Sequence, residues 1–592
     1  MILKFIDWLI IGSFFLLSLV IGLYASKRAG KSTAEFFLSG RNMPWWLLGI
    51  SMVATTFSCD TPNLVTDLVR QHGVAGNWAW WAFLLTGMLT VFVYAGLWRR
   101  SGVMTDLEFY ELRYSGKMAS FLRGFRALYL GAFFNMMVIA LVSLALIKIG
   151  AVMLQWPAWK TLIIASAITL IYSTLGGLTG VILTDFFQFI IAMVGAVGAA
   201  IIVLRLPGIN SLHELLQNPE VSAKINLLPD FTNNEALITL LILPIAVQWW
   251  SVWYPGAEPG GGGYIAQRML SAKNEKGAIK ATLLFNILHY AFRPWPWIIV
   301  ALASLVIFPD LDSLARAFPH IDSGIIRHDL AYPAMLSFLP AGFIGLVVAS
   351  LIAAFMSTVA TQLNWGASYV VNDFYRRFLN NKASEKTLVR VGRITTVLLM
   401  FFSALLALLL SNALQAFQIL LQIGAGTGLI FILRWFWWRI NGYSELSAMI
   451  ISFVIALYFQ FIHPLTSLPE ISSAVQLVIG VAVTTLTWLL VTWLTPPENI
   501  ETLTRFHKLI RAGGPGWKKV VAKIGEKEDH QDMKEPRWEV PRGILCMVIG
   551  CLLVYSTLFA TGYWIYGNIT PAIILTAVVI VSVFLLFKVW KR

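Results

Sequence analysis

The chain has few charged residues and few cysteines for its length. Only 12% of its 592 residues are charged, whereas 58% are hydrophobic, and the mean hydropathy is +0.73. This composition excludes an ordinary soluble protein. The three cysteines, Cys59, Cys546 and Cys551, form neither a disulfide framework nor a metal-ligand pattern. Because all three lie in apolar segments, we expect them to be free thiols.

The sequence also lacks the features of most membrane-bound enzymes and pumps. It has no Walker-type phosphate loop, which argues against ATP-driven transport, and its apolar segments contain no His-rich metal cluster and no nucleophile beside a base. The one sizeable polar stretch, 496–540, is too short for a catalytic or signalling domain. We interpret it as a cytoplasmic linker with one surface-lying helix, and we do not expect an enzyme or a membrane sensor.

Long apolar runs are abundant and predict an all-α polytopic membrane protein with about fifteen transmembrane helices. The first run follows Met1 without a cleavage site and is expected to be a retained span. The expected spans are 4–25, 45–70, 76–98, 126–155, 159–180, 181–206, 234–268, 280–309, 333–376, 389–411, 415–438, 445–465, 471–494, 541–563 and 568–588.

The net charge of +14 indicates topology rather than nucleic-acid binding. With the N-terminus outside, most of the 44 Lys and Arg residues fall in loops on one side of the membrane. Basic loops are typically cytoplasmic, so we expect a multi-pass protein of the inner (plasma) membrane, surrounded by lipid, with the C-terminus inside and an odd number of spans.

Two of the expected spans are interrupted by residues that disfavour helix. The first break runs over 55–62 and contains Pro62, and the second runs over 254–263 and contains two prolines and five glycines. Unwound backbone at membrane depth survives only in protein or beside a wet cavity, where its carbonyls can coordinate Na⁺. A simple proline kink, or for the second break a cytoplasmic hinge loop, is the alternative.

A third segment, 342–378, carries a cluster of hydroxyl side chains at the centre of an apolar helix. The cluster comprises Ser357 and Thr358, with Thr361 one turn further along. Hydroxyls at this depth indicate a buried polar site. They can also bond to their own helix or to a neighbouring helix, which would give them only a packing role.

The chain resembles the sodium/solute symporters, a family that includes bacterial proline, sialic acid and sugar transporters. The resemblance covers residues 5–495 and is carried by four stretches: AEFFLSGR at 34–41, GGLTGVILTDFFQ at 176–188, Gln267-Arg268 after the second break, and the helix 342–378. The second and fourth stretches are specific when they occur together.

The resemblance implies a LeuT-type core of two inverted five-helix repeats with additional helices. The corresponding divisions of the chain are an N-terminal helix at 1–30, the repeats at 42–206 and 234–440, two further helices at 441–495, the linker at 496–540 and two C-terminal helices at 541–592.

The resemblance also implies a Na⁺ site between the first broken helix and the eighth core helix. Its expected ligands are the carbonyl groups of Ala54, Phe57 and Ala354 and the hydroxyls of Ser357 and Thr358. Such an uncharged set of oxygens suits a monovalent hard cation.

A second Na⁺ is implied by some members of the family. Its ligands would be Asp185, Ser357 and Thr361, although Ala360 stands where a further hydroxyl is expected. Asp185 has the alternative interpretation of a capping residue at a helix N-terminus.

The solute is expected beside the cation. The candidate lining residues are Ser58, Asp60, Thr61, Trp78, Trp80, Trp81, Gln248, Trp249, Ser251, Gln418 and Gln422. Aromatic faces and amides suit a sugar, although Trp clusters are also interfacial anchors. Asp60, Asp67 and Arg70 share a helical face and are candidates for an outer ion-paired gate or a zwitterion site.

The favoured function is Na⁺-coupled symport of a small polar solute, most simply a sugar. A proton-coupled permease using Asp185 or Glu258, and Na⁺-coupled uptake of amino acids or carboxylates, are the alternatives. Sugar-transporting relatives place a carboxylate where this chain has Ala79, and the segment PGAEPGGGG with Glu258 is an insertion. Glu258 is a candidate for binding a cation, a proton or the solute, or for lying in cytoplasmic water. Oligomeric state is not indicated by the sequence.

Overall fold

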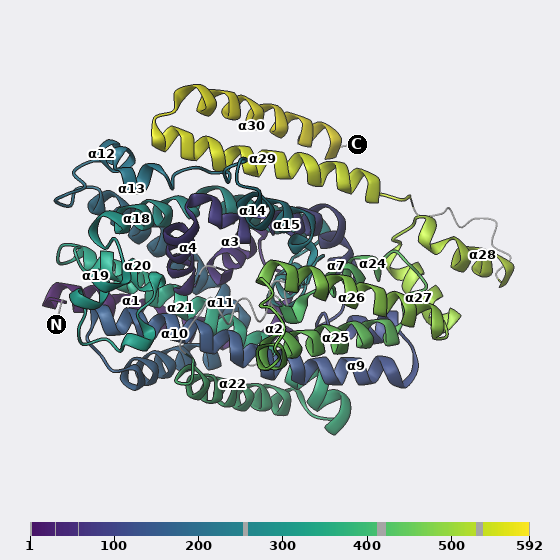
Figure 1. Ribbon diagram of the computed structural model, residues 1–592. Coiled ribbons are helices and arrows are strands. Elements are labelled where there is room, and N and C mark those ends of the chain that lie inside the picture. Colours follow the sequence, from purple (N-terminus) through teal and green to yellow (C-terminus); the bar gives the residue numbers. More distant parts are fainter. Residues whose placement is uncertain are drawn as a thin grey trace.

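The computed structural model describes residues 3–29, 31–56, 58–252, 258–410, 422–527 and 537–590. Apart from one isolated β-bridge between Met43 and Ala272, the regular structure of these residues is helical. Most of the long helices run side by side, with α12, α13 and α19 gathered at one end and α27 and α28 at the other (Figure 1). The prediction of an all-α polytopic membrane protein is confirmed.

The first part of the chain contains α1 Phe5–Ala29, α2 Thr33–Leu38, α3 Trp45–Thr56, α4 Asp60–His72, α5 Trp78–Trp81, α6 Leu84–Leu89, α7 Ala95–Ser101, α8 Glu108–Arg113, α9 Gly116–Leu128, α10 Asn135–Met153 and α11 Ala158–Val203. The middle part contains α12 Leu212–Gln217, α13 Pro219–Ser222, α14 Asn234–Leu237, α15 Leu243–Ala246, α16 Gly263–Ser271, α17 Glu275–Ile287, α18 Pro294–Ile307, α19 Leu311–Ala317, α20 Ala331–Leu336, α21 Phe343–Ser368 and α22 Glu385–Ala407.

The last part contains α24 Gly428–Leu433, α25 Gly442–Leu457, α26 Ser473–Leu494, α27 Ile500–Ile510, α28 Lys518–Lys527, α29 Val540–Tyr566 and α30 Ile569–Trp590. Segments of π-helix continue several of these helices, among them η4 Tyr129–Phe134, η7 Leu288–Phe292 and η10 Tyr369–Leu379.

Eleven helices in the described ranges are long and apolar enough to cross a membrane, and Trp45–Thr56, Ala158–Ile171 and Asn234–Trp250 are shorter apolar helices. The shorter helices are parts of the expected spans 45–70, 159–180 and 234–268, each of which is divided by a break or kink. One of these apolar helices therefore corresponds to every expected span except 415–438, of which the structure describes residues 422–438, including the short helix α24.

Both predicted breaks are present. Helix α3 ends at Thr56 and α4 begins at Asp60 with Pro62 in its first turn, where a missing N–H is tolerated. After the second break, α16 begins only at Gly263, and Gly260 and Gly261 before it have φ of 85° and 97°. This backbone conformation favours glycine, so the glycine-rich sequence is what allows the chain to unwind there.

Close packing of α21 against the start of α10 depends on two glycines, Gly366 and Gly131. A Cβ added at Gly366 of α21 would lie 2.0 Å from Asn135 Nδ2 and 2.5 Å from the carbonyl oxygen of Gly131. The Asn135 amide in turn donates to the carbonyl of Gln362 at 2.6 Å. A side chain at position 366 would therefore push α21 away from α10.

We expect Gly366→Val to lower the thermal unfolding midpoint of the purified protein strongly, because overpacking a close contact typically costs about 1–3 kcal/mol or more. Tryptophan fluorescence during a thermal ramp measures this. The matched control is Gly12→Val in α1, where an added Cβ meets nothing within 4 Å. Equal destabilisation of the two variants would show that the close contact is unimportant.

The segment expected to be a linker packs against the body of the protein and contains two helices rather than one. Phe506 of α27 and Trp517 are buried, and their rings lie 5.5 and 5.3 Å from the guanidinium carbon of buried Arg113. The Trp517 indole donates to the Trp435 carbonyl at 3.0 Å. Helix α27 and the turn that precedes α28 therefore cover an arginine at the end of the molecule that was predicted to be cytoplasmic.

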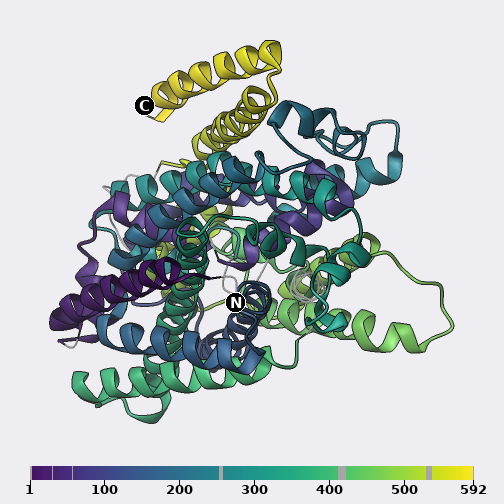
Figure 2. The ribbon, with the colours of Figure 1, turned by 90° about the vertical axis from the view of Figure 1, so that its left-hand side faces the viewer.

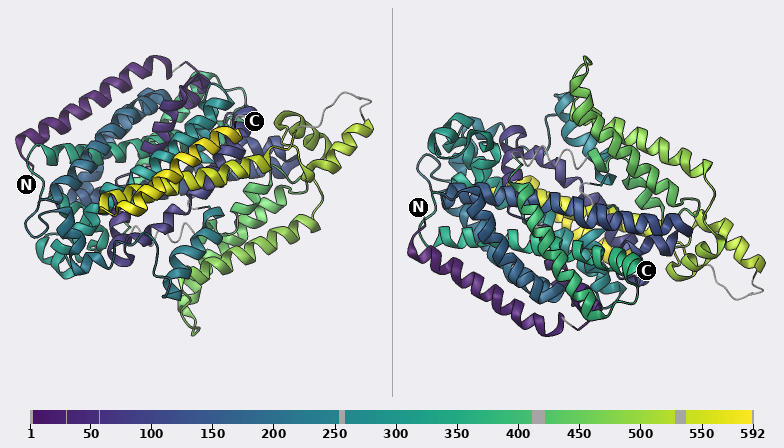
Figure 3. Two further views of the ribbon diagram at one scale, coloured as in Figure 1. Left: turned by 90° about the horizontal axis from the view of Figure 1, so that it is seen from above. Right: turned by 90° about the horizontal axis from the view of Figure 1, so that it is seen from below.

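The two C-terminal helices form a hairpin at the periphery (Figures 2 and 3). Helix α29 packs on the body of the molecule, where the Tyr555 hydroxyl donates to the Trp81 carbonyl at 2.9 Å. Helix α30 packs mainly against α29, and only 17% of the residues in its apolar stretch are buried. Its apolar surface is suited to lipid.

Candidate functional site

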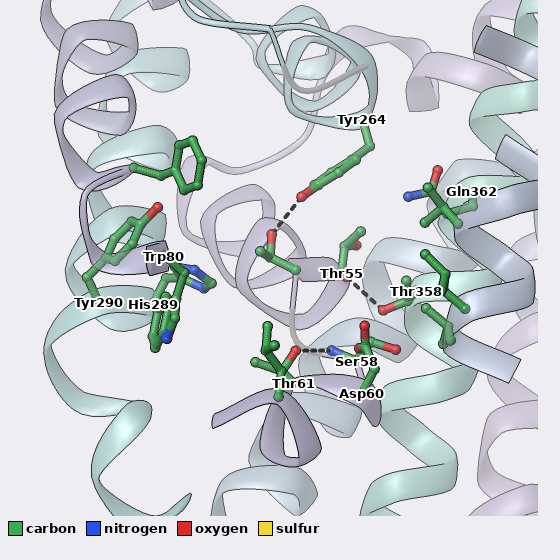
Figure 4. Close-up of a pocket in the computed structure, with 16 residues that line it drawn as sticks. Thr55, Ser58, Asp60, Thr61, Trp80, Tyr264, His289, Tyr290, Thr358 and Gln362 are labelled. Carbon is green, nitrogen blue, oxygen red and sulfur yellow. Dashed lines mark hydrogen bonds between the residues drawn. The ribbon is translucent and has the colours of Figure 1, made fainter. Parts of the chain in front are cut away.

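A cavity of about 140 Å³ lies beside the first broken helix (Figure 4). Many of the polar side chains that line it come from the break itself, and the aromatic side chains come from three other segments, namely residues 80–83, α16 and η7. The lining residues are Thr55, Thr56, Ser58, Asp60, Thr61, Leu64, Trp80, Phe83, Val138, Leu141, Val142, Tyr264, His289, Tyr290, Thr358 and Gln362. The expectation that Ser58, Asp60 and Thr61 lie together at a cavity agrees with this arrangement.

The break supplies a polar surface because the helix is interrupted there. The backbone N–H of Ser58 donates to Thr61 Oγ1 at 3.4 Å, so it is satisfied outside the helical pattern. Asp60 is the first residue of α4, where the helix dipole favours a negative charge. The cavity therefore presents one carboxylate surrounded by hydroxyl groups.

The opposite side of the cavity is aromatic. Figure 4 shows Trp80, His289 and Tyr290 facing Asp60, Thr358 and Gln362 across it, with Tyr264 at one end. The Trp80 and Tyr290 rings are stacked at 5.8 Å, and His289 Nδ1 is buried without a hydrogen-bond partner. Flat apolar rings beside unpaired polar atoms are suited to a ligand that has both hydroxyl groups and C–H faces.

Tyr264 closes one end of the cavity. Its hydroxyl and that of Thr56 are hydrogen-bonded at 2.9 Å, which joins α16 to the end of α3. A smaller cavity of about 60 Å³ lies beyond and shares Tyr264, Thr56 and Tyr290 with the first. It extends to Glu258 and Gly262 in the second break, toward the end of the molecule predicted to be cytoplasmic.

The residues expected to bind Na⁺ come from helices that meet in the structure. Thr358 Oγ1 on α21 donates to the Thr55 carbonyl on α3 at 2.7 Å, at the edge of the cavity. Ala54 and Ala354 are buried on the same two helices, and Phe57 lies outside the described residues. Uncharged oxygens from α3 and α21 thus lie together at Thr55 and Thr358, and oxygens of this kind are suited to a monovalent cation.

Ser357 points to a different group. Its hydroxyl donates to Asp185 Oδ1 at 2.6 Å, and Ser51 donates to Asp185 Oδ2. Asp185 lies well beyond the kink at Gly177 within α11, so it does not cap a helix. Asp185 and Ser357, which the family resemblance placed in one candidate ion site, are therefore in contact.

The same cluster contains a cation of the protein itself. Arg268 Nη2 lies 3.7 Å from Asp185 Oδ2, and both side chains are 0% exposed. Arg268 also donates to Thr361 Oγ1 at 2.7 Å, and Thr361 Oγ1 lies 3.0 Å from Thr55 Oγ1. Thr361 thus contacts the arginine, while Ala360 beside it provides no side-chain oxygen.

The other expected solute-binding residues do not line the cavity. Trp78 donates to the Leu227 carbonyl at 3.0 Å and packs against Tyr555 of α29, and Trp81 packs against Trp78 and Phe559. The remaining ones have partners elsewhere: Gln248 with the Ala79 carbonyl, the Trp249 carbonyl with Thr86, Ser251 with the Val247 carbonyl, and Gln422 with Gln476. Gln418 lies outside the described residues.

Three charged residues singled out in the sequence are buried in other contacts. Glu258 is 4% exposed and paired with Arg126, so it does not lie in water. Arg70 donates to the carbonyls of Ser304 and Phe308, while Asp67 accepts from Gln71. Within the described residues no ion pair joins Asp67 to Arg70, so the expected outer gate is not formed in this structure.

Several cavity residues were not anticipated. Gln362 lies one turn after Thr358 on the same face of α21, and His289 and Tyr290 are polar residues inside the apolar span 280–309. Polar residues in the middle of an apolar span indicate a functional site, and this signal is present in the sequence. Tyr264 follows the glycine run directly, but only the structure brings it to Thr56.

The chain is similar in sequence to several known proteins. A model of the sodium:solute symporter family matches residues 36–452. The chain is 27% identical over 478 residues to a sodium/glucose cotransporter of Vibrio parahaemolyticus, covering 78% of this chain and 86% of that one. It is 26% identical over 491 residues to a sodium/mannose cotransporter of Bos taurus, with coverage of 78% and 80%. It is 25% identical over 542 residues to a sodium/myo-inositol cotransporter 2 of Homo sapiens, with coverage of 83% and 77%.

A solved structure has a fold similar to that of most of the chain. The substrate-bound, outward-open state of a Na⁺-coupled sialic acid symporter matches with a TM-score of 0.66 and 20% identity, covering 84% of this chain and 99% of that one. At this identity the likeness establishes the fold alone. The predicted LeuT-type fold class is confirmed.

Proposed function

Because the chain belongs to the sodium:solute symporter family, we propose that it imports a small, neutral, sugar-like solute together with Na⁺ by alternating access. The observation that carries the proposal is the contact of Thr358 with the Thr55 carbonyl at the edge of a cavity lined by hydroxyl and aromatic groups. The proposed setting is the plasma membrane, with the N-terminus outside and the C-terminus in the cytoplasm.

The charge of the cavity supports a neutral solute. Asp60 is the one acidic residue among the described residues that line it, and that lining contains no Lys or Arg. A carboxylate of a solute would meet the like charge of Asp60 and no Lys or Arg among these lining residues, which is unfavourable in a buried site. Sugar hydroxyls can instead donate to Asp60 while a ring face packs on Trp80 or Tyr290. Uptake of carboxylates is therefore disfavoured.

Coupling follows from where the two ligands bind. Na⁺ held between α3 and α21 would order the first break, whose residues Ser58, Asp60 and Thr61 also contact the solute. Each ligand then strengthens the binding of the other, typically by about 1–3 kcal/mol. An inside-negative potential adds about 2.3 kcal/mol per 100 mV for each Na⁺ that enters.

Release requires the opposite end of the cavity to open. The Tyr264 to Thr56 hydrogen bond separates the cavity from the smaller one that leads to Glu258. Movement of α16 relative to α3 would break this bond and join the two cavities. We propose that this movement, with closure on the other side, constitutes the inward-facing step.

Uptake of a labelled solute panel into proteoliposomes tests the proposal. The panel comprises sugars, inositol, sugar acids, amino acids and small carboxylates, each measured with an inward Na⁺ gradient, an inward proton gradient or no gradient. We expect Na⁺-stimulated uptake of a neutral polyhydroxylated compound. Uptake driven by protons and indifferent to Na⁺ would support the proton-coupled permease instead, and Na⁺-driven uptake of a carboxylate would contradict the neutral-solute proposal.

A further inference from the structure

The smaller cavity beyond Tyr264 is lined by buried polar atoms that have no hydrogen-bond partner within the described part of the chain. They are Glu258 Oε2, Asn286 Oδ1 and His289 Nδ1. Glu258 is 4% exposed and Asn286 is 0% exposed. A buried polar atom that stays unpaired lowers the stability of the fold, so such atoms are rare without a reason. Three of them on one cavity indicate a place that a hydrogen-bonding molecule occupies at some stage.

The threonine and asparagine side chains of this cavity present acceptors to it. Thr90 Oγ1 donates to the Thr86 carbonyl at 2.8 Å, and Thr282 Oγ1 donates to the Ala278 carbonyl at 2.9 Å. The amide nitrogen of Asn286 donates to the Thr282 carbonyl at 2.8 Å. Because these donors are used within the helices, the oxygens that remain can only accept. A ligand rich in hydroxyl groups can donate to them.

The charge and the apolar surface of the cavity favour the same kind of ligand. Glu258 is the one acidic residue among its described lining residues, and that lining contains no Lys or Arg. The rings of Phe285, Tyr264 and Tyr290 complete the wall, and the two tyrosines also line the main cavity. A carboxylate, hydroxyl groups and ring faces are thus combined here as they are around Asp60, which suits a neutral polyhydroxylated molecule.

Glu258 is fixed by one carboxylate oxygen and leaves the other unpaired. Its Oε1 accepts from Arg126 of α9, and its carbonyl accepts from the N–H of Gly261 at 2.9 Å in a turn of the second break. The guanidinium carbon of Arg126 lies 5.2 and 5.1 Å from the rings of Tyr110 and Phe431. Arg126 therefore positions the carboxylate, and Oε2 is held ready to accept.

Glu258 lies where successive cavities meet. The hydrogen bond between Tyr264 and Thr56 separates the main cavity from the smaller one. A third cavity of about 40 Å³ shares Glu258 and is lined by Arg126 and Thr427 as well. A molecule that leaves the main cavity past Tyr264 therefore meets Glu258 next. This carboxylate belongs to the segment PGAEPGGGG, the insertion noted in the sequence.

We infer that Glu258 and Asn286 form a second solute site, which a neutral polyhydroxylated molecule occupies on its way from the main cavity to the cytoplasm. The inference rests on the proposed function for the class of solute and adds a site to it. The solute reaches this site when Tyr264 moves away from Thr56, and its hydroxyl groups then donate to Glu258 Oε2 and Asn286 Oδ1. Because neither residue lines the main cavity, both affect solute affinity at the cytoplasmic face.

Transport measured separately from each face of the membrane tests the inference. Right-side-out and inside-out membrane vesicles containing the full-length protein expose the outer and the cytoplasmic face. The probe is whichever of labelled glucose, mannose or myo-inositol wild type takes up fastest with an inward Na⁺ gradient. The quantity compared is the probe concentration that gives half-maximal transport from each face.

Two variants remove the proposed acceptors. Glu258→Gln keeps the shape and an oxygen for Arg126 but loses the charged acceptor, and it should raise the half-maximal concentration at the cytoplasmic face about tenfold or more. Asn286→Ala leaves the pair with Arg126 intact and should raise it about three- to tenfold. The value at the outer face should stay at that of wild type in both, which also shows that each variant is folded.

Glu445→Gln is the matched control. Glu445 is a buried carboxylate paired with Arg434 at 3.3 Å, and Arg434 lies over the Phe431 ring as Arg126 does. Glu445 does not line the smaller cavity. Its variant should therefore keep the wild-type half-maximal concentration at both faces.

The remaining outcomes separate the inference from the proposed function. A shift in Glu258→Gln without one in Asn286→Ala would show that the ion pair only holds the second break in place, and would overturn the inference. Equal shifts at both faces, or shifts as large in Glu445→Gln, would overturn it too. Wild type that takes up none of the three probes with Na⁺ would overturn the proposed function, and the inference with it.

Discussion

Thr358→Val should raise the Na⁺ concentration needed for half-maximal uptake by about ten- to a hundredfold. Valine has nearly the shape of threonine, so packing of α21 is kept while the hydroxyl is lost. The loss removes one oxygen of the proposed ion site and leaves the buried Thr55 carbonyl without the 2.7 Å hydrogen bond. Initial uptake rates of the solute identified by the panel, measured over a range of Na⁺ concentrations, give this value.

Ser368→Ala is the matched control for Thr358→Val. Ser368 lies on the same helix and is buried, but its hydroxyl donates to the carbonyl of Trp365 at 2.7 Å within that helix. Its loss should leave the Na⁺ dependence unchanged. If both variants shifted the Na⁺ dependence equally, the effect would come from altered helix packing and not from a lost ligand.

Asp60→Asn should raise the solute concentration for half-maximal uptake by about ten- to a hundredfold. A hydrogen bond from a solute hydroxyl to a buried carboxylate contributes about 1.5–3 kcal/mol, and asparagine keeps the shape while removing the charge. Na⁺ binding in the absence of solute should be largely retained. Uptake kinetics at saturating Na⁺, together with Na⁺ binding to the purified variant, measure the two effects separately.

Asp67→Asn tests whether any buried charge on α4 has this effect. Asp67 is buried on the same helix but accepts from Gln71 at 2.6 Å and does not line the cavity. Its variant should retain the wild-type solute dependence. A loss of Na⁺ affinity in Asp60→Asn as large as the loss of solute affinity would place Asp60 at the ion and not at the solute.

The helices and their breaks were largely predictable because each is indicated by residues within its own segment of the sequence. Apolar length gave the spans, Pro62 gave the first break, and the glycine run before Tyr264 gave the second. The boundary between two expected spans differs for a local reason too: the chain kinks at Gly177 within α11 (Ala158–Val203), three residues before the expected end of the span 159–180.

The site was predictable only where the family resemblance supplied long-range contacts. It correctly grouped Ser357 with Asp185, and Thr358 with the first break. It gave no indication that Arg268 would lie beside Asp185, because that contact depends on how α16 packs against α11 and α21. Side-chain direction explains Trp78 and Trp81, which lie next to Trp80 in the sequence but face α29.

The packing of Phe506 and Trp517 on Arg113 affects how far the chain can be shortened from its C-terminus. The family match ends at residue 452, and a chain shortened to the LeuT-type core would still contain Arg113 while losing Phe506 and Trp517. The guanidinium group of Arg113 would then lose both rings and would keep its hydrogen bonds to the carbonyl groups of Arg434, Trp437 and Trp438. The segment between Ile500 and Trp517 is therefore part of the folded body although it lies outside the region that the family model matches, whereas α30 packs mainly against α29.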